Sequence, residues 1–285
     1  MAVHNQTHSQ VLHPHTLLEL FSLWSRIPGA VPFAGGSGLI LKDLDPGGAR
    51  GIFREQPLLP REILSLEKID DLHAITRTER YLEIGAMVRL NEIIALGKIV
   101  PSAFSQTLKG IANPRVRNLA TIGGNIIGSG DTLAPLCALD AVYELRSAAG
   151  SRWISALRFS SAPIALQKGE ILTRLRVPLD EWNYTIYKKF NACESGGEGG
   201  VLILVVQNQK NILAKIQIVF SGTALFRNKD SESFLEGKVL PLDLKDIVHY
   251  RKFWENYLET GQKPIPILRD KIINAIEAGI AGLSD

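Results

Sequence analysis

The first regular pattern of apolar residues in the chain has helical spacing. Its members recur every three or four positions: Leu17, Leu18, Leu20, Phe21, Trp24 and Ile27. This period predicts an amphipathic helix over residues 17–27. Thr16 can cap the start of this helix, and Pro28-Gly29 ends it. Residues 1–12 are polar and lack the period, so we expect a flexible N-terminus there.

Between residues 31 and 178 the pattern changes repeatedly between that of a strand and that of a helix. Short apolar or alternating runs predict strands at residues 31–33, 39–42, 62–66, 81–86, 141–145, 153–154 and 171–177. Runs with a period of 3.6 predict helices at residues 90–96, 101–111 and 133–139. Residues 45–61 are rich in Pro, Gly and Arg, which indicates a surface connection.

A different pattern begins after residues 178–182, where we place a domain boundary. Three consecutive apolar runs predict strands at residues 184–190, 201–207 and 212–220. Short loops between consecutive strands favour an antiparallel sheet. Amphipathic runs at about 243–259 and 266–280 predict two helices that cover one face of this sheet. The pattern as a whole predicts an α+β protein.

Composition and charge exclude several classes of protein. Apolar residues make up 45% of the 285 residues, and the net charge of +3 is too small to indicate nucleic-acid binding. The longest apolar run, residues 201–206, is far too short to span a membrane, and no secretory signal is visible. The only cysteines, Cys137 and Cys193, are too few for an iron–sulfur cluster, which needs about four protein ligands. We expect a cytoplasmic protein with no metal site of its own.

Residues 112–131 carry few apolar side chains suited to a core and many groups suited to binding. Four glycines permit positive φ angles and a close approach to a ligand: Gly123, Gly124, Gly128 and Gly130. Thr121 and Asn125 add short hydrogen-bonding side chains. Successive backbone N–H groups in such a turn can form an anion site. The alternative is an ordinary glycine-rich connection between strands.

Residues 32–39 repeat this chemistry, with Gly35-Gly36 after an apolar strand end and the hydroxyl of Ser37 next. Two such turns suit a ligand with two phosphates. Neither stretch has the G-x-G-x-x-G pattern at the start of a helix, and neither ends in Gly-Lys-Ser/Thr. A dinucleotide fold of the Rossmann type and a P-loop are therefore both disfavoured.

Two segments carry a resemblance to a known family. Residues 117–126, Arg-Asn-Leu-Ala-Thr-Ile-Gly-Gly-Asn-Ile, with Asp131 and residues 134–140, resemble the second flavin-binding segment of molybdenum hydroxylase flavoproteins. Residues 34–39, Ala-Gly-Gly-Ser-Gly-Leu, resemble the first segment. This family comprises the FAD-binding subunits or domains of xanthine dehydrogenase and carbon monoxide dehydrogenase. The resemblance extends over nearly the whole chain and is diffuse after residue 191.

The resemblance implies a fold and a domain plan. A FAD-binding domain of the PCMH type would occupy residues 13–178, with subdomains at about 13–60 and 61–178 and the flavin between them. A C-terminal domain resembling that of the carbon monoxide dehydrogenase flavoprotein would occupy residues 183–285, with a three-stranded antiparallel sheet and helices.

The resemblance also implies which residues bind FAD. The first segment, whose backbone amides would meet the pyrophosphate, comprises Pro32, Phe33, Ala34, Gly35, Gly36, Ser37, Gly38 and Leu39. Those of the second segment would close on the pyrophosphate and the ribityl chain: Thr121, Gly123, Gly124 and Asn125. Asp131 would accept hydrogen bonds from FAD hydroxyls, Leu172 and Ile111 would contact the flavin, and Lys188 would lie near its ring. The residues alone also allow Leu172 as strand core, Lys188 as a solvated strand edge and Asp131 as a helix N-cap.

Three departures from the family pattern concern the surroundings of the flavin. Gly38 replaces a common acidic residue, the loop 128–130 is shorter than usual, and residues 191–200 replace a segment that is usually Arg-rich and then acidic. A pyrophosphate cradle built of backbone is compatible with all three changes.

The function implied is that of a FAD-binding electron-transfer subunit of a molybdenum hydroxylase complex. Electrons would pass from a molybdenum cofactor subunit through the clusters of a [2Fe-2S] subunit to FAD, and from there to NAD or another acceptor. No side chain would need to act as a catalytic acid or base. The alternatives are a flavin-free assembly subunit of such a complex and a stand-alone flavin oxidase.

Overall fold

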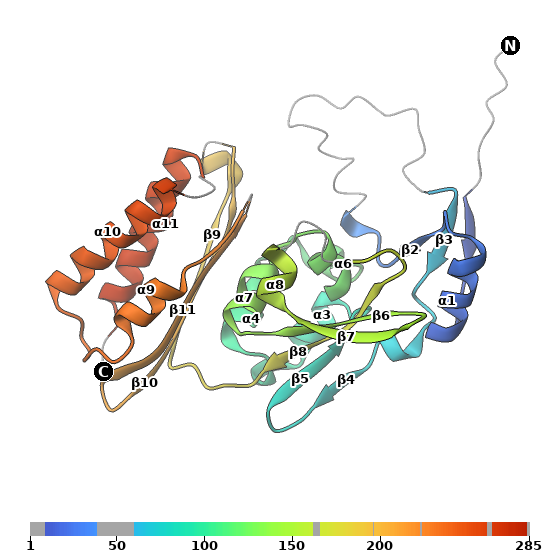
Figure 1. Ribbon diagram of the computed structural model, residues 1–285, viewed down its shortest axis with the longest axis horizontal. Coiled ribbons are helices and arrows are strands. Elements are labelled where there is room, and N and C mark those ends of the chain that lie inside the picture. Colours follow the sequence, from blue (N-terminus) through green and yellow to red (C-terminus); the bar gives the residue numbers. More distant parts are fainter. Residues whose placement is uncertain are drawn as a thin grey trace, which may run out of the picture. The chain divides into compact units, whose positions relative to one another are not determined.

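The chain forms two compact units, which Figure 1 shows as ribbons. The computed structural model describes residues 9–38, 60–161, 166–195, 197–222, 224–260 and 264–283. Unit 1 comprises Met1–Leu96, Ala112–Gly130 and Val142–Val177, and unit 2 comprises Gly97–Ile111, Asp131–Ala141 and Pro178–Asp285. Each unit is therefore assembled from segments that are distant in sequence. The domain boundaries given above remain a prediction.

Unit 1 begins with a small parallel sheet of order β1-β3-β2 and the predicted helix α1. Their bounds are β1 Gln10–Leu12, α1 Leu17–Arg26, β2 Val31–Phe33 and β3 Glu62–Ser65. The hydroxyl of Thr16 caps α1 by accepting from the amide of Glu19, as predicted. Residues 10–12 were expected to be flexible, and that expectation is wrong, because β1 pairs with β3 from Gln10↔Glu62 onward. Strand β3 also shows that this sheet extends beyond residue 60 of the first predicted subdomain.

The second sheet of unit 1 has the order β4-β5-β8-β6-β7 among the described residues. Its strands are β4 Ile75–Arg77, β5 Tyr81–Gly85, β6 Val142–Ser147, β7 Gly150–Ser155 and β8 Ile171–Pro178. The helices of this unit are α3 Leu90–Ala95, α5 Pro114–Arg117, α6 Ile122–Ile127 and α8 Ala156–Ser161, with a 3₁₀ turn η1 at Asp70–Leu72. All the strands predicted here are confirmed, and β4 is an addition. Predicted strand 39–42 and residues 45–59 lie outside the described residues.

Ion pairs cross the polar face of this sheet. Glu83 on β5 pairs with Arg174 and Arg176 on β8 at 2.7 and 2.6 Å, and Glu144 on β6 pairs with Arg174 at 2.6 Å. Burial alone would raise the pKa of Glu83, but hydrogen bonds and charge from the two arginines outweigh it and leave the pKa below its usual value. These pairs fix β5 against β8 and so hold the residues that follow β5, against which the second glycine-rich segment docks.

Unit 2 contains an antiparallel sheet of order β12-β11-β10-β9 within the described residues. Its strands are β9 Tyr184–Phe190, β10 Gly200–Gln209, β11 Ile212–Gly222 and β12 Leu225–Arg227. The three predicted strands are confirmed, with registers such as Ile203↔Tyr187 and Ile203↔Val219. The prediction of three strands was one too few, since β12 also pairs with β11. A run of three residues is too short for its alternation to be recognised.

Helices cover both faces of this sheet. Their bounds are α4 Ser102–Gly110, α7 Leu133–Ala138, α9 Lys229–Leu235, α10 Leu244–Thr260 and α11 Pro266–Ala281, with 3₁₀ turns η2 Gly97–Ile99 and η3 Ala192–Glu194. Leu202, Leu204 and Phe220 point to the face that packs on Trp254 of α10 and Ile272 of α11. The opposite face packs on α4 and α7, which contact β9, β10 and β11. Helices α10 and α11 confirm the two predicted C-terminal helices.

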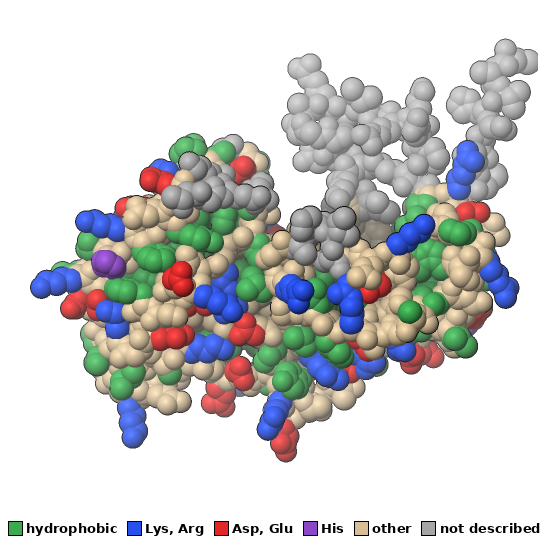
Figure 2. Space-filling view, viewed as in Figure 1, with side chains coloured by type: hydrophobic (Ala, Val, Ile, Leu, Met, Phe, Trp, Pro, Cys, Tyr) green, Lys and Arg blue, Asp and Glu red, His purple; other side chains and the backbone are tan. Residues whose placement is uncertain are grey.

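The surface carries both signs of charge. On the face drawn in Figure 2, Lys and Arg side chains are interspersed with Asp and Glu, in keeping with the net charge of +3. No helix among the described residues is long and apolar enough to cross a bilayer.

Candidate flavin site

The first glycine turn of unit 1 follows strand β2 directly. Gly36 has a left-handed backbone with φ of +66°, and a Cβ there would lie 2.6 Å from the ring of Phe33. A Cβ on Gly35 would overlap the carbonyl oxygen of Leu119. The turn therefore needs glycine at both positions, one for its φ angle and one for close packing. It also brings the two predicted segments into contact inside unit 1.

The backbone amides of this turn are open. Within the part of the chain that the structure describes, no carbonyl or side chain accepts a hydrogen bond from the N–H groups of residues 34–38. Ser37 and Gly38 are helical, so their N–H groups have no partner within their own helix. A row of free N–H groups on a left-handed turn is an anion site. Its size and chemistry fit the pyrophosphate of a dinucleotide.

The second glycine-rich segment forms helix α6 rather than an open turn. Thr121 caps the helix by accepting from the amide of Gly124 at 3.1 Å. The N–H groups of Ile122 and Gly123 donate to the carbonyls of Val88 and Ala86 at 2.9 and 2.8 Å. The prediction that successive free N–H groups of this stretch bind an anion is therefore wrong here, because residues after β5 already accept those bonds. None of Gly123, Gly124, Gly128 and Gly130 has a positive φ angle.

Glycine is required in α6 for closeness of packing. A Cβ on Gly123 would lie 2.8 Å from the carbonyl oxygen and the Cβ of Ala86. Gly124, by contrast, is exposed, and Asn125 beside it is half-exposed. The second segment therefore offers a ligand the bare backbone of Gly124 and the amide side chain of Asn125, while Thr121 is buried in its capping role.

A polar network holds the loop before α6. The side chain of Asn91 on α3 donates to the carbonyl of Pro114 at 3.0 Å and accepts from Arg117 Nε at 3.1 Å. Arg117 also donates to the carbonyl of Ala112 at 3.1 Å, and Ala112 has a left-handed φ of 44°. These contacts set the path of residues 112–119 and so the position of Leu119 against the first glycine turn.

The contacts of the two turns leave two predicted positions of unit 1 untested. Leu172 on β8 is 5% exposed and pairs with Leu145 on β6, so its own surroundings are those of a strand in the core. Leu39 lies outside the described residues. Both stay predictions as flavin contacts.

Unit 2 holds the remaining predicted residues, and one of them has an unexpected partner. Asp131 precedes α7 and pairs with Lys189 of β9 at 2.7 Å through its Oδ2 atom. Lys189 also donates to the carbonyl of Gly110 at 3.0 Å, directly before Ile111, which is buried. The alternative role of Asp131 as a helix N-cap is wrong, because Thr132 occupies that position.

Lys188 lies on the other face of β9. Side chains alternate along a strand, so Lys188 shares its face with Ile186 and Phe190. These two residues belong to the core between the sheet and helices α10 and α11. Lys188 is exposed and β9 is an edge strand of the described sheet, as the alternative reading expected. Sequence reasoning missed Lys189, although the alternation of apolar residues at 184, 186 and 190 could have separated the two lysines.

Tyr187 is a second residue that the sequence did not single out. Its side chain is half-buried on the same face as Lys189, and a Cβ on Gly110 would overlap its hydroxyl. Burial raises the pKa of the Tyr187 phenol, and the carboxylate of Asp131 raises it further. Tyr187, Lys189 and Asp131 thus form one polar cluster beside Ile111. No group of His, Cys, Asp and Glu among the described residues is arranged to hold a metal ion.

Comparison with known proteins identifies the family. A family model described as the FAD binding domain in molybdopterin dehydrogenase matches residues 7–180, more than half of the chain. The chain belongs to this family. It is a FAD-binding oxidoreductase chain of the molybdenum hydroxylases, as the two segments indicated, and FAD is its cofactor. The open amides of residues 34–38 fit that cofactor on structural grounds.

Relatives of this FAD-binding chain include subunits of several dehydrogenases. The glyceraldehyde dehydrogenase medium chain of Sulfolobus acidocaldarius is 30% identical over 227 residues, which are 76% of this chain and 77% of that protein. The carbon monoxide dehydrogenase medium chain of Afipia carboxidovorans is 28% identical over 174 residues, which are 58% of this chain and 57% of that protein. The second alignment thus spans little more than half the length of that relative.

A solved structure confirms the predicted α+β fold class of this FAD-binding chain. One chain in the crystal structure of quinoline 2-oxidoreductase from Pseudomonas putida 86 matches it with a TM-score of 0.76 and 21% identity. The match covers 96% of this chain and 94% of that chain. At this identity the likeness concerns the fold alone.

Proposed function

We propose that this chain is the electron-transfer subunit of a molybdenum hydroxylase complex, with a [2Fe-2S] subunit and a molybdenum cofactor subunit as partners. The observation that carries the proposal is the row of free amides at residues 34–38, held against Leu119 of the second segment. Bound FAD supplies the redox chemistry, taking up electrons from the partner's clusters and releasing them to NAD or another acceptor.

The chain's own residues bind and orient the cofactor. The amides of Gly35, Gly36 and Ser37 donate to the pyrophosphate, and the bare backbone at Gly124 leaves room for it to approach. The side chain of Asn125 adds a donor and an acceptor on the same side. Phe33 supports the turn from beneath, since its ring lies under Gly36.

Unit 2 contributes the polar cluster around Asp131. Oδ2 of Asp131 accepts from Lys189, and its Oδ1 has no partner among the described residues, so it can accept a hydrogen bond from a FAD hydroxyl. Lys189 supplies the cation that the resemblance assigned to Lys188, because Lys189 shares the neighbourhood of Asp131 and Ile111. A cation near the flavin ring favours the reduced, anionic form of the cofactor.

The test is the flavin content of the purified full-length chain. We expect a yellow protein with one FAD per chain, and we expect acid precipitation to release all of it. Release is expected because neither glycine segment contains a Cys or His to which flavin could be linked. A colourless protein that takes up no added FAD would contradict the proposal and favour a flavin-free assembly subunit.

A further inference from the structure

Helix α7 is fixed to the sheet of unit 2 at both of its ends. At its N-terminal end, Asp131 pairs with Lys189 on β9. At its C-terminal end, Asp140 pairs with Arg227 on β12 at 2.8 Å. Strands β9 and β12 are the two edges of the described sheet, so α7 crosses the sheet between the two ion pairs. A displacement at one end of so short a helix moves the other.

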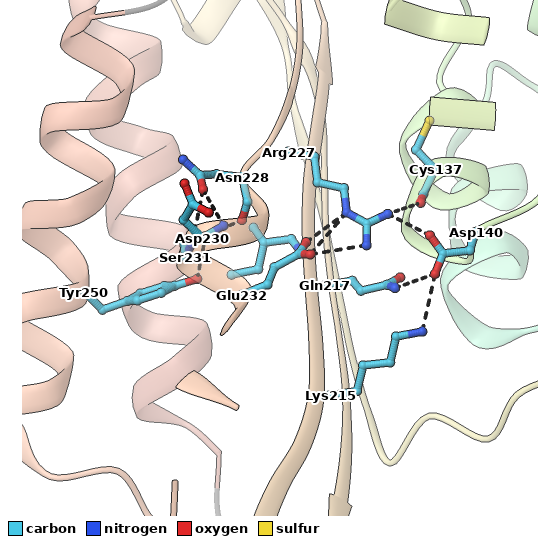
Figure 3. Close-up of polar contacts among 11 residues, drawn as sticks. Cys137, Asp140, Lys215, Gln217, Arg227, Asn228, Asp230, Ser231, Glu232 and Tyr250 are labelled. Carbon is cyan, nitrogen blue, oxygen red and sulfur yellow. Dashed lines mark hydrogen bonds and ion pairs between the residues drawn. The ribbon is translucent and has the colours of Figure 1, made fainter. Parts of the chain in front are cut away.

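Arg227 is at the centre of the contacts at the second end, which Figure 3 shows. Its side chain is 5% exposed and lies between two carboxylates, with Glu232 at 3.0 Å from Nε and Asp140 at 2.8 Å from Nη1. Nη1 also donates to the carbonyl of Cys137 in α7 at 3.0 Å. A planar guanidinium presents five N–H donors on three nitrogens in a fixed geometry, whereas a lysine presents three donors on a single nitrogen.

Asp140 has further partners, which add to the attachment of α7 to the sheet. Oδ2 of Asp140 accepts from Gln217 at 2.6 Å and from Lys215 at 3.3 Å, both on β11. Burial alone would raise the pKa of Asp140, but the hydrogen bonds from Arg227 and Gln217 outweigh it, so its pKa lies below the usual value. Asp140 also has a left-handed φ of 52°, a conformation that Asp and Asn adopt more readily than other non-glycine residues.

We infer that Asp140 and Arg227 are positioning residues for the cofactor: they hold α7 so that Asp131 and Lys189 keep their place beside FAD. This inference rests on the proposed function, because it takes Asp131 and Lys189 as FAD contacts. Arg227 reaches α7 through Asp140 and the carbonyl of Cys137, while Glu232 of α9 holds the other side of its guanidinium. The inference predicts an energetic coupling between the Asp131 end and the Asp140 end of α7.

The first test is Asp140→Asn in the full-length chain, with Asp246→Asn as the matched control. Asn tolerates a left-handed backbone, so the substitution removes charge with little strain. Asp246 belongs to α10 and pairs with Lys238 at 2.6 Å, so the control removes one carboxylate charge and one ion pair from unit 2, whereas Asp140→Asn removes one charge and the pairs with Arg227 and Lys215. We expect amide hydrogen exchange in α7 of the FAD-free protein to become about 5- to 30-fold faster in Asp140→Asn, with α10 unaffected. The control should leave α7 unchanged.

The second test links this end of α7 to the cofactor. Asp140→Asn should weaken FAD binding about 3- to 10-fold, and Arg227→Lys should act in the same direction. In an Asp131→Ala background, where the proposed FAD contact and the ion pair with Lys189 are both removed, Asp140→Asn should weaken binding no further. Isothermal titration of FAD into the apoproteins of the wild type and of these variants measures all five affinities.

The outcomes distinguish failure of the positioning role from failure of the proposed function. Unchanged exchange in α7, or additive losses of FAD affinity in the double variant, would overturn the positioning role. Faster exchange in α7 combined with a wild-type chain that binds no FAD would instead refute the proposed function, and the assignment of Asp140 and Arg227 to FAD with it. An equal loss of FAD affinity in Asp140→Asn and in the Asp246→Asn control would mean that both substitutions act by general destabilisation. That result would also overturn the inference.

Discussion

At the scale of single residues, the glycines of the two segments perform different tasks. Gly36 adopts a positive φ angle, whereas Gly35 and Gly123 are needed because backbone of Leu119 and Ala86 lies where a side chain would be. Gly124 is exposed, but a Cβ there would lie 3.0 Å from the capping hydroxyl of Thr121, which is a tight contact with a side chain rather than with backbone. Glycine at position 124 also keeps the exposed side of α6 open to a ligand.

Gly124→Val is expected to abolish FAD binding while the fold persists. The branched side chain would occupy the exposed side of α6 where the pyrophosphate approaches. The matched variant is Gly124→Ala, which favours the helix but adds only one carbon, and should weaken FAD binding less without loss of thermal stability. FAD stoichiometry and circular dichroism measure the two effects. Stoichiometric FAD in a folded valine variant would place the pyrophosphate elsewhere.

The two adjacent lysines of β9 give a second test at this scale. Lys189→Met should lower the two-electron midpoint potential of bound FAD by about 30 mV, which corresponds to about 1.4 kcal/mol, because the reduced flavin loses a nearby cation. Lys188→Met is the natural control, since Lys188 points to the opposite face of the strand. Spectroelectrochemical titration gives both potentials. A larger shift for Lys188→Met would restore the original assignment of Lys188.

At the scale of elements, the periodicity of apolar residues predicted the long helices and strands. Helices α1, α10 and α11 and the long strands β8 to β11 carry enough periodic residues to be recognised. The strands that were missed are short: β1, β4 and β12 have three residues each, and β1 is a strand only because it pairs with the distant strand β3. Helix α6 was expected as a turn, because two adjacent glycines disfavour a helix in isolation.

The same distinction applies to the candidate site. The motifs predicted which segments bind FAD, and their contact through Gly35 and Leu119 agrees with that prediction. The motifs could not predict that the first segment keeps its amides free while those of α6 are used, because the acceptors, Ala86 and Val88, lie in a third segment. The face of β9 that each lysine takes was likewise set by packing on α4 and α7.

Gly35→Ala tests the contact between the two segments. The new Cβ would overlap a backbone carbonyl, which cannot move as a flexible side chain can, so the variant should lose about 1–3 kcal/mol of stability or more. Gly29→Ala in the same unit is the control, because its Cβ would meet the nearest atom at an ordinary 3.5 Å. Chemical denaturation with and without FAD measures both. Equal stabilities of the two variants would show that the segments do not pack as described.

At the scale of the whole molecule, residues assigned to FAD occur in both compact units. Unit 1 holds the glycine segments and Leu172, and unit 2 holds Ile111, Asp131 and the two lysines. In unit 2 these residues are attached to the C-terminal sheet through Lys189 and, by way of α7, through Arg227. The C-terminal half of the chain, where the resemblance is diffuse, therefore supplies the partners that hold Asp131 in unit 2.

The cysteine content sets what the chain can do without partners. Cys137 is buried and Cys193 is exposed, and no disulfide joins them. Two thiols cannot ligate an iron–sulfur cluster, which needs about four protein ligands, so a cluster that passes electrons to the flavin would lie outside these 285 residues. We therefore expect the chain to co-purify with a cysteine-rich iron–sulfur subunit and a molybdenum cofactor subunit.

Reduction of the flavin by substrate tests this expectation. A candidate hydroxylase substrate should bleach the flavin absorbance of the complex at the rate of catalysis and leave that of the isolated chain unchanged. The control is dithionite, which should reduce the flavin in both samples. Substrate turnover at the full rate by the isolated chain would mean a self-sufficient flavin oxidase, and the electron-transfer role would then be wrong.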